Sequence, residues 1–296
     1  MSIDRRNAEG DDRPTGANLD ARTVAGFGRE WARFDQSKLV GTEYDELFDA
    51  YFSIFPFDDL PADAEGFDLG CGSGRWAAGV ARRVGRLHCI DPAKEALEVA
   101  RLRLGTAGNV SFHLAGSEAI PLPEGSQDFG YALGVLHHIP DSARALSGAV
   151  RKLKPGAPFL AYIYYRLENR PRWYRALWRA SDAMRQVICR APFGLRIGMT
   201  SIIAALVYWP LARTSKLAEN LSYDPLHLPL SGYRNLSFYS MRTDALDRFG
   251  TRLEQRFSRS EIEQMMSAAG LVDIRFREEA PYWVACGRRA HPPSSE

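Results

Sequence analysis

The stretch FDLGCGSGRW, residues 67–76, decides the fold of this chain. Its three glycines occupy every second position, and an aspartate stands two residues before the first of them. An apolar run that ends in glycines and opens into a helical pattern is typical of a loop that holds a nucleotide cofactor, because glycine permits a tight turn and close backbone approach. The spacing G-x-G-x-G differs from the G-x-G-x-x-G of dinucleotide-binding enzymes. These residues leave open which nucleotide cofactor is bound.

The sequence around this stretch alternates between short apolar runs and helical patterns from residue 65 to about 163. Such alternation predicts a parallel sheet with helices on both faces. Near the end of the chain, Ser258 and Glu261 form a capping box, Gly270 ends the helix, and two strands separated by Pro281 predict a hairpin. We therefore predict an α/β fold: a Rossmann-like, doubly wound, mostly parallel sheet of seven strands whose last strand is antiparallel.

Two long segments do not follow this alternation. Residues 23–60 are rich in aromatic side chains and predict an N-terminal helical cap. Residues 166–250 are too many for a loop, so we predict a helical lid inserted after the fifth strand. The cofactor-binding domain is then made of residues 61–165 and 251–290, and the charged residues 1–22 predict a disordered leader.

The composition limits the classes of function. The net charge of +2 over 296 residues does not favour a nucleic-acid partner. Four scattered cysteines without a CxxC pair predict reduced thiols in the cytosol, and we expect no metal site because no histidine and carboxylate pairs occur at ligand spacing. The apolar run from Ile197 to Ala212 is shorter than a membrane-spanning helix, and Pro210 is expected to interrupt it.

Four motifs together resemble those of class I S-adenosylmethionine-dependent methyltransferases, in the branch that includes the ubiquinone and menaquinone C-methyltransferases and many small-molecule methyltransferases. In order along the chain they are FDLGCGSGRW, CIDPAKEALEVAR, GSEAIPLPEGSQDFGYALGVLHHIPD and LKPGAPFLAYI. The segment FGREWARF also resembles an N-terminal helix that many of these enzymes fold over the cofactor. The resemblance implies S-adenosylmethionine as the cofactor.

The resemblance also implies roles for individual residues. Asp68 and the backbone around the glycines would face the methionine end of the cofactor, Asp91 would accept hydrogen bonds from the ribose hydroxyls, and Pro92 would pack beside the adenine. The family often has an aspartate that meets the adenine amino group where this chain has Ser117, so Ser117 or the following Glu118 is expected there. The other residues of the implied cofactor site are Gly70, Cys71, Gly72, Gly74, Leu136 and His137, with packing as the default role of Cys71.

Catalysis needs a general base only if the acceptor must lose a proton to become nucleophilic, as a hydroxyl does. The nearest candidates are His137 and His138, which follow the fourth strand, and Tyr164, at the tip of the fifth; Tyr165 beside it is a candidate wall or base residue. A histidine at the end of a strand can also have a purely structural role.

The lid leaves several interpretations of the acceptor open. Its arginines and aromatic residues can be the solvated face of a helical cap with its own core, or the walls of a pocket for an apolar or anionic small molecule. Its apolar run with basic flanks can also lie on a membrane surface, whereas RNA is a weaker alternative. We predict a cytoplasmic enzyme that methylates an oxygen or carbon of a small or lipid-like acceptor, with peripheral contact to the inner membrane face left open. The alternative is a protein that binds S-adenosylmethionine as a sensor or partner subunit without transferring the methyl group.

Overall fold

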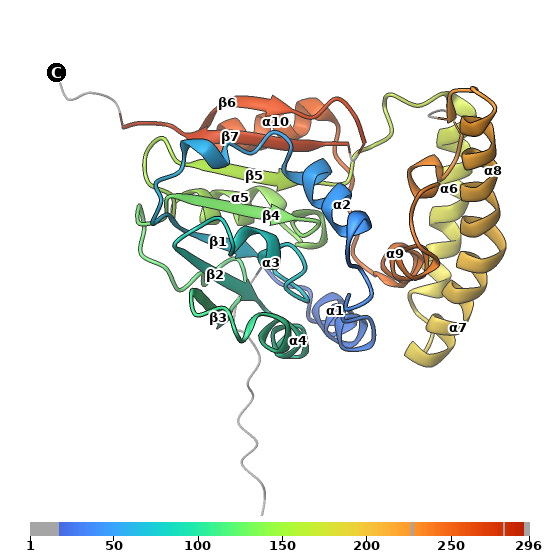
Figure 1. Cartoon of the computed structure of the whole chain (residues 1–296), viewed down its shortest axis with the longest axis horizontal. Coiled ribbons are helices and arrows are strands. Elements are labelled where there is room, and N and C mark those ends of the chain that lie inside the picture. Colours follow the sequence, from blue (N-terminus) through green and yellow to red (C-terminus); the bar gives the residue numbers. More distant parts are fainter. Residues whose placement is uncertain (1–17, 226–227, 281, 293–296) are drawn as a thin grey trace, which may run out of the picture.

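The computed structural model describes residues 18–225, 228–280 and 282–292 (Figure 1). Its centre is a seven-stranded sheet with the order β3-β2-β1-β4-β5-β7-β6, which confirms the predicted doubly wound fold. The first five strands are parallel, and β7 runs antiparallel between β5 and β6. The strands are β1 (Glu65–Leu69), β2 (Arg86–Asp91), β3 (Val110–Leu114), β4 (Phe129–Leu133), β5 (Pro158–Tyr162), β6 (Leu271–Phe276) and β7 (Val284–Arg289).

Helices cover both faces of the sheet and bury a hydrophobic core on each. One core contains Phe67 and Phe159 of the sheet and is covered by α5 (Ser142–Val150) and α10 (Arg259–Ala268). The other contains Phe129, Tyr131 and Leu160 and is covered by α2, α3 and α4. Both helices of the first face are capped at their start: Asp141 accepts a hydrogen bond from the backbone N–H of Arg144 at α5, and Ser258 with Glu261 forms the predicted capping box of α10. The helices of the second face are α2 (Thr42–Phe52), α3 (Ala77–Val80) and α4 (Lys94–Leu104).

The N-terminal segment places a helix against the carboxyl ends of the strands. Helix α1 (Ala21–Arg33) is capped by Asp20, packs against α4 and also touches α9 (Phe238–Gly250). The predicted leader therefore ends earlier than expected, since Ala21 and Arg22 are already helical; residues 1–17 lie outside the described residues. A 3₁₀ turn, η1 (Phe57–Asp59), follows α2 and leads into β1.

The long segment between β5 and α10 is helical and stands beside the carboxyl ends of the strands, with α9 between the sheet and the other three helices (Figure 1). It has a small core of its own, in which Ile188, Tyr208, Met241 and Phe249 are buried. We call helices α6 to α9 the lid. Its remaining elements are α6 (Arg172–Ile188), α7 (Phe193–Ile203), the π-helical turn η3 (Ala204–Tyr208), α8 (Trp209–Asn220) and the 3₁₀ turn η5 (Ser231–Tyr233).

The expectation that Pro210 interrupts the apolar run is wrong. Helices α7 and α8 form one helix of 28 residues through η3, long and apolar enough to cross a membrane by length and composition, with 22% of its most apolar window buried. Pro210 is the second residue of α8, two positions after the end of the π turn. A π turn changes the backbone hydrogen-bonding pattern locally, so the helix can continue although proline has no N–H group to donate.

Candidate active site

The carboxyl ends of β1, β2 and β4 border a small cleft of about 120 Å³, and helix α1 closes it from the opposite side. Ligands bind at this edge of open α/β sheets, where the strand order reverses. The sheet contributes Gly70, Asp91 and Gly134, whereas α1 contributes Phe27 and Trp31. We refer to this space as the small cleft.

Asp91 is held in a fixed orientation at the wall of the small cleft. One carboxylate oxygen accepts a hydrogen bond from the backbone N–H of Gly72 at 2.9 Å, and the other accepts one from Ala93 at 2.8 Å. Burial raises the pKa of Asp91 to about 6, although the two N–H donors act in the opposite direction. The side chain is therefore mainly ionised at neutral pH, and its remaining lone pairs can accept hydrogen bonds from ribose hydroxyls.

The glycine loop allows close contacts that a side chain would prevent. Gly70 has a φ of +75°, and a Cβ atom at this position would lie 2.4 Å from a methyl group of Val135. A Cβ atom on Gly72 would lie 3.0 Å from the indole nitrogen of Trp31, so the Trp31 side chain of α1 packs directly against the loop. The loop is thus a narrow cradle between Val135 and α1.

Asp68 lies beneath this loop and is almost fully buried. Its Oδ2 atom has no hydrogen-bond partner among the described residues. Burial raises the pKa of Asp68 to about 8; a hydrogen bond with Tyr131 opposes this increase, and the nearby charge of Asp91 adds to it. A buried carboxyl group of this kind favours a cationic partner, because a positive charge offsets the cost of ionisation. A buried carboxyl group with one unpartnered oxygen beside the glycine loop and a fixed carboxylate at the end of β2 therefore fit the ammonium and the ribose of S-adenosylmethionine.

We expect the substitution Gly70→Ala to destabilise the protein by about 2–4 kcal/mol, because it combines backbone strain with overpacking. The methyl group would meet Val135 at 2.4 Å, and the positive φ disfavours any L side chain. Urea denaturation measures this difference. Gly26→Ala is the matched control, since a Cβ atom there has no neighbour within 4 Å. Equal unfolding free energies for the two variants would contradict the described loop geometry.

The other predicted cofactor residues differ in their placement. Pro92 and Ser117 line the small cleft, whereas Glu118 forms an ion pair with Arg144 and is not part of the lining. The geometry therefore favours Ser117 over Glu118 as the residue near the adenine. Among the described residues, neither cavity is lined by Asp68, Cys71, Gly72, Gly74 or Leu136. The first four lie in or beneath the glycine loop, and Leu136 is fully buried in the sheet core.

The three candidate bases occupy different environments. His138 lines the small cleft, and its Nδ1 atom lies 2.7 Å from the carbonyl oxygen of Leu253. His137 lines neither cavity: it is fully buried and stacks on the ring of Tyr164 with centroids 3.7 Å apart. Burial lowers the pKa of His137 well below its ordinary value, which leaves the imidazole neutral. Its position behind Tyr164 does not suit contact with an acceptor.

Tyr164 faces a second, larger cavity, but its chemistry does not favour a role as a base. Its hydroxyl group donates a hydrogen bond to Asp247 at 2.9 Å. Burial raises the pKa of Tyr164 well above its ordinary value, and the negative charge of Asp247 adds to this effect. The neighbouring Tyr165 also lines the larger cavity.

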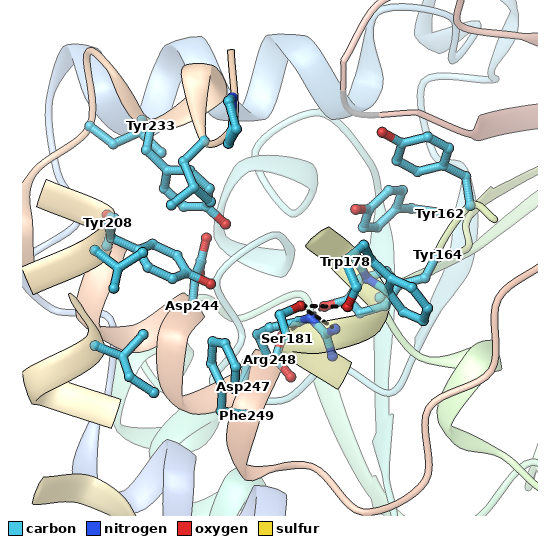
Figure 2. Close-up of a pocket in the computed structure, with 18 of the residues that line it drawn as sticks. Tyr162, Tyr164, Trp178, Ser181, Tyr208, Tyr233, Asp244, Asp247, Arg248 and Phe249 are labelled. Atoms are coloured by element: carbon cyan, nitrogen blue, oxygen red, sulfur yellow. Dashed lines mark hydrogen bonds between the residues drawn. The ribbon is translucent and has the colours of Figure 1, made fainter. Parts of the chain in front are cut away.

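The larger cavity has a volume of about 670 Å³ and lies between the sheet and the lid. We call it the large cavity. It shares Phe27, Trp31, Leu133 and Gly134 with the small cleft, so the two spaces adjoin at the carboxyl end of β4. Figure 2 shows aromatic side chains of the sheet, such as Tyr162, opposite those of the lid. Its aromatic lining includes Tyr51, Trp76, Tyr162, Tyr164, Trp178, Tyr208, Tyr233 and Phe249.

Several residues that line these cavities were not among the predicted site residues. Arg75 belongs to the glycine stretch itself, and Trp31 to the segment FGREWARF, so both lie within motifs that signalled the cofactor site. Asp244 and Asp247 of α9 face the large cavity, but their sequence pattern is that of an ordinary amphipathic helix. No group of three or more histidine, cysteine, aspartate or glutamate residues that could hold a metal ion occurs within the part of the chain that the structure describes.

Comparisons with known proteins agree with this geometry. Residues 67–161 match the family model of a methyltransferase domain. A ubiquinone biosynthesis O-methyltransferase of Hydrogenovibrio crunogenus is 31% identical over 129 residues, which cover 43% of this chain and 51% of that protein. The O-methyltransferase resE of Aspergillus sclerotiorum is 34% identical over 94 residues, which cover 30% and 36% of the two chains. The aligned segments thus span about half or less of the curated relatives' own lengths.

A solved structure supports the fold over most of the chain. An O-methyltransferase family protein from Burkholderia thailandensis aligns with a TM-score of 0.51 at 15% identity, covering 92% of this chain and 60% of the other. At this identity the likeness concerns the fold alone. The strand order, the glycine loop with Asp91 and the family match point to one conclusion: residues 67–161 belong to the class I S-adenosylmethionine-dependent methyltransferases.

Proposed function

We propose that this protein transfers a methyl group from S-adenosylmethionine to an oxygen or carbon atom of a lipophilic small molecule that binds in the large cavity. The observation that carries the proposal is the junction of the small cleft with the large cavity at Leu133 and Gly134. An acceptor under the lid would therefore lie next to the cofactor. The names of the two curated relatives, both O-methyltransferases, favour oxygen as the methylated atom.

The chain supports such a reaction mainly by positioning. The cofactor supplies an electrophilic methyl group on its sulfonium. Orienting the nucleophile in line with that group can contribute about 7–11 kcal/mol toward lowering the barrier. Helix α1 and the lid enclose the junction, so Phe27 and Trp31 exclude water on the side away from the sheet. His138, at the wall of the small cleft, remains our candidate among the three predicted bases.

Transfer of a labelled methyl group tests this function. The protein is incubated with S-adenosylmethionine that carries a tritiated methyl group and with an organic extract of host cells. We expect label in an organic-soluble small molecule, and none with Asp91→Ala. Binding of the cofactor without any transfer would support the alternative, a sensor or partner subunit. Label confined to protein or RNA would overturn the small-molecule acceptor.

We further propose that the outer face of the lid rests on an anionic membrane surface in the cytoplasm. Large apolar side chains that line neither cavity are exposed along α6, α7, η3 and α8, among them Val187, Leu195, Ile202, Leu206 and Leu217. Large apolar side chains that remain exposed along one segment are typical of an interaction site. Exposed arginines lie on α6, just after it, and on α8, and include Arg172, Arg175, Arg179, Arg190 and Arg213.

The charge of the lid segment supports the same partner. Residues 166–250 contain 13 lysine and arginine residues against six aspartate and glutamate residues, a net charge of +7, whereas the whole chain carries +2. Basic residues beside an apolar helix face are attracted to anionic lipids. Leu177, Met184 and Val207 are exposed and also line the large cavity. A lipophilic acceptor could therefore enter the cavity from the membrane.

We expect the protein to float with vesicles of phosphatidylglycerol and phosphatidylcholine, and the double variant Ile202→Glu, Leu206→Glu to remain at the bottom of the gradient. The side chains of Ile202 and Leu206 are both more than half exposed, so the double variant should fold normally. Leu102→Glu is the control, because Leu102 on α4 is 89% exposed and lies outside the lid. Wild-type protein that does not float, and elutes as a dimer that the double variant splits, would assign this face to self-association.

A further inference from the structure

Most charged groups on the wall of the large cavity have an ion-pair or hydrogen-bond partner among their neighbours. Arg248 forms an ion pair with Glu254 at 3.1 Å, and Arg256 contacts the same carboxylate at 2.9 Å. Asp247 accepts the hydrogen bond of Tyr164. These groups form a connected network at one side of the cavity, where Figure 2 shows Arg248 beside Ser181 and Trp178. They are therefore not the groups that await a ligand.

Arg75 is the exception among the cations of this wall. Its guanidinium lies over the ring of Trp76, 4.2 Å from the centroid, and faces the large cavity. Among the described residues, its side chain makes no hydrogen bond and no ion pair. A guanidinium presents five N–H donors in a planar fork that matches a carboxylate. Arg75 can therefore bind an anionic group that enters the cavity.

Asp244, like Asp247, lines the cavity and has no ion pair among the described residues; the hydroxyl group of Tyr233 donates a hydrogen bond to its carboxylate, which leaves further lone pairs for a ligand. Asp244 projects from α9 into the cavity, and Figure 2 shows the hydroxyl groups of Tyr208 and Tyr233 close to its carboxylate. Burial raises the pKa of Asp244 to about 6, whereas the charge of Arg75 acts in the opposite direction. Arg75 is thus near enough to influence Asp244, yet the two form no ion pair within 4 Å in the described structure. Both side chains line the large cavity, so one polar ligand can contact the two of them.

Resting on the methyltransferase function proposed above, we propose that the acceptor is a lipophilic hydroxy acid: its carboxylate binds Arg75, and its hydroxyl group donates a hydrogen bond to Asp244. Arg75 already provides Asp244 with a positive charge, so a neutral hydroxyl suits this position better than an ammonium group. The tyrosines and tryptophans of the cavity provide contacts for an apolar or aromatic body between the two polar ends.

The probe is 6-hydroxy-2-naphthoate, compared with its methyl ester and with 2-naphthoate, which lacks the hydroxyl group. Binding is followed by fluorescence in the presence of S-adenosylhomocysteine. We expect the acid to bind about 10-fold more tightly than the ester, because a bidentate arginine–carboxylate pair is lost in the ester. Arg75→Gln should abolish this preference, whereas Arg75→Lys should keep part of it. Asp244→Asn should reduce the preference for the hydroxylated acid over 2-naphthoate about fivefold.

The controls separate this inference from the function on which it rests. Arg82→Gln removes an exposed arginine outside the cavity and should change none of these affinities. The inference is overturned if the wild-type protein binds acid and ester equally, or binds neither. Transfer of labelled methyl groups to a compound in the extract can still succeed in either case, so the proposed function would stand. If Arg75→Gln weakens S-adenosylmethionine binding and leaves the acid preference intact, Arg75 holds the cofactor's carboxylate and the inference fails.

Discussion

Replacing Asp91 with alanine should weaken S-adenosylmethionine binding about 100-fold or more, because each hydrogen bond to a charged group contributes about 1.5–3 kcal/mol. The carboxylate is fixed by the N–H groups of Gly72 and Ala93 and faces the small cleft. Its loss removes the acceptor for the ribose hydroxyls. It also leaves both N–H groups without their partner, so the glycine loop loses part of its support. Isothermal titration calorimetry measures the affinity directly.

The matched control is Asp63→Ala. Asp63 is exposed in the turn before β1 and lies outside both cavities. Asp63→Ala changes the net charge of the protein by the same amount as Asp91→Ala, so any general electrostatic effect on cofactor binding appears in both variants. An Asp91→Ala protein that binds the cofactor as tightly as the control would remove the central residue of the proposed site.

The second large effect concerns Glu254, which follows α9 at the end of the lid. Glu254→Gln should lower the free energy of unfolding by about 3 kcal/mol, since it leaves two arginines without their charged partner in a buried position. The Glu254 side chain is 2% exposed and contacts both Arg248 of α9 and Arg256. The residues after Glu254 are hydrogen-bonded to the segment that follows β5: the backbone N–H of Phe257 donates a hydrogen bond to the carbonyl oxygen of Tyr164 at 2.9 Å. We therefore expect faster proteolysis within the lid as well.

Glu124→Gln provides the comparison, because Glu124 pairs with Arg151 at 3.2 Å with both side chains more than half exposed. Exposed ion pairs contribute about 0–1 kcal/mol, so this variant should unfold nearly as the wild type does. Chemical denaturation of both variants tests the difference. Similar stability of the two would mean that the lid does not depend on the Glu254 ion pairs.

The sheet could be predicted from the sequence because its signals are local. The strands of a parallel sheet are buried on both faces and appear as short apolar runs, and the capping residues Asp141 and Ser258 mark where helices begin. The glycines follow β1 and Asp91 ends the neighbouring parallel strand β2, so the sheet topology alone brings them together. The seven strands and the antiparallel hairpin at the end of the sheet were predicted for these reasons and are confirmed.

A pocket at the lid was one of the interpretations that the sequence left open, but which residues line the cavities could not be predicted, because the lining depends on contacts between distant segments. Whether Ser117 or Glu118 faces the cleft depends on Arg144, which pairs with Glu118. His137 follows the fourth strand as expected, but the stacking of Tyr164 separates it from the cavity. The helix from Phe193 to Asn220 is apolar on several sides, so periodicity does not reveal which side chains remain exposed.

A crystal structure of the protein with S-adenosylhomocysteine tests the central claim most directly. We predict that the ribose hydroxyls lie within hydrogen-bonding distance of Asp91 and that the sulfur atom lies at the Leu133–Gly134 edge, facing the large cavity. That position would place the methyl group of the intact cofactor where an acceptor under the lid can reach it. Electron density for the ligand elsewhere, or a sulfur atom directed away from the large cavity, would contradict the proposed site of methyl transfer.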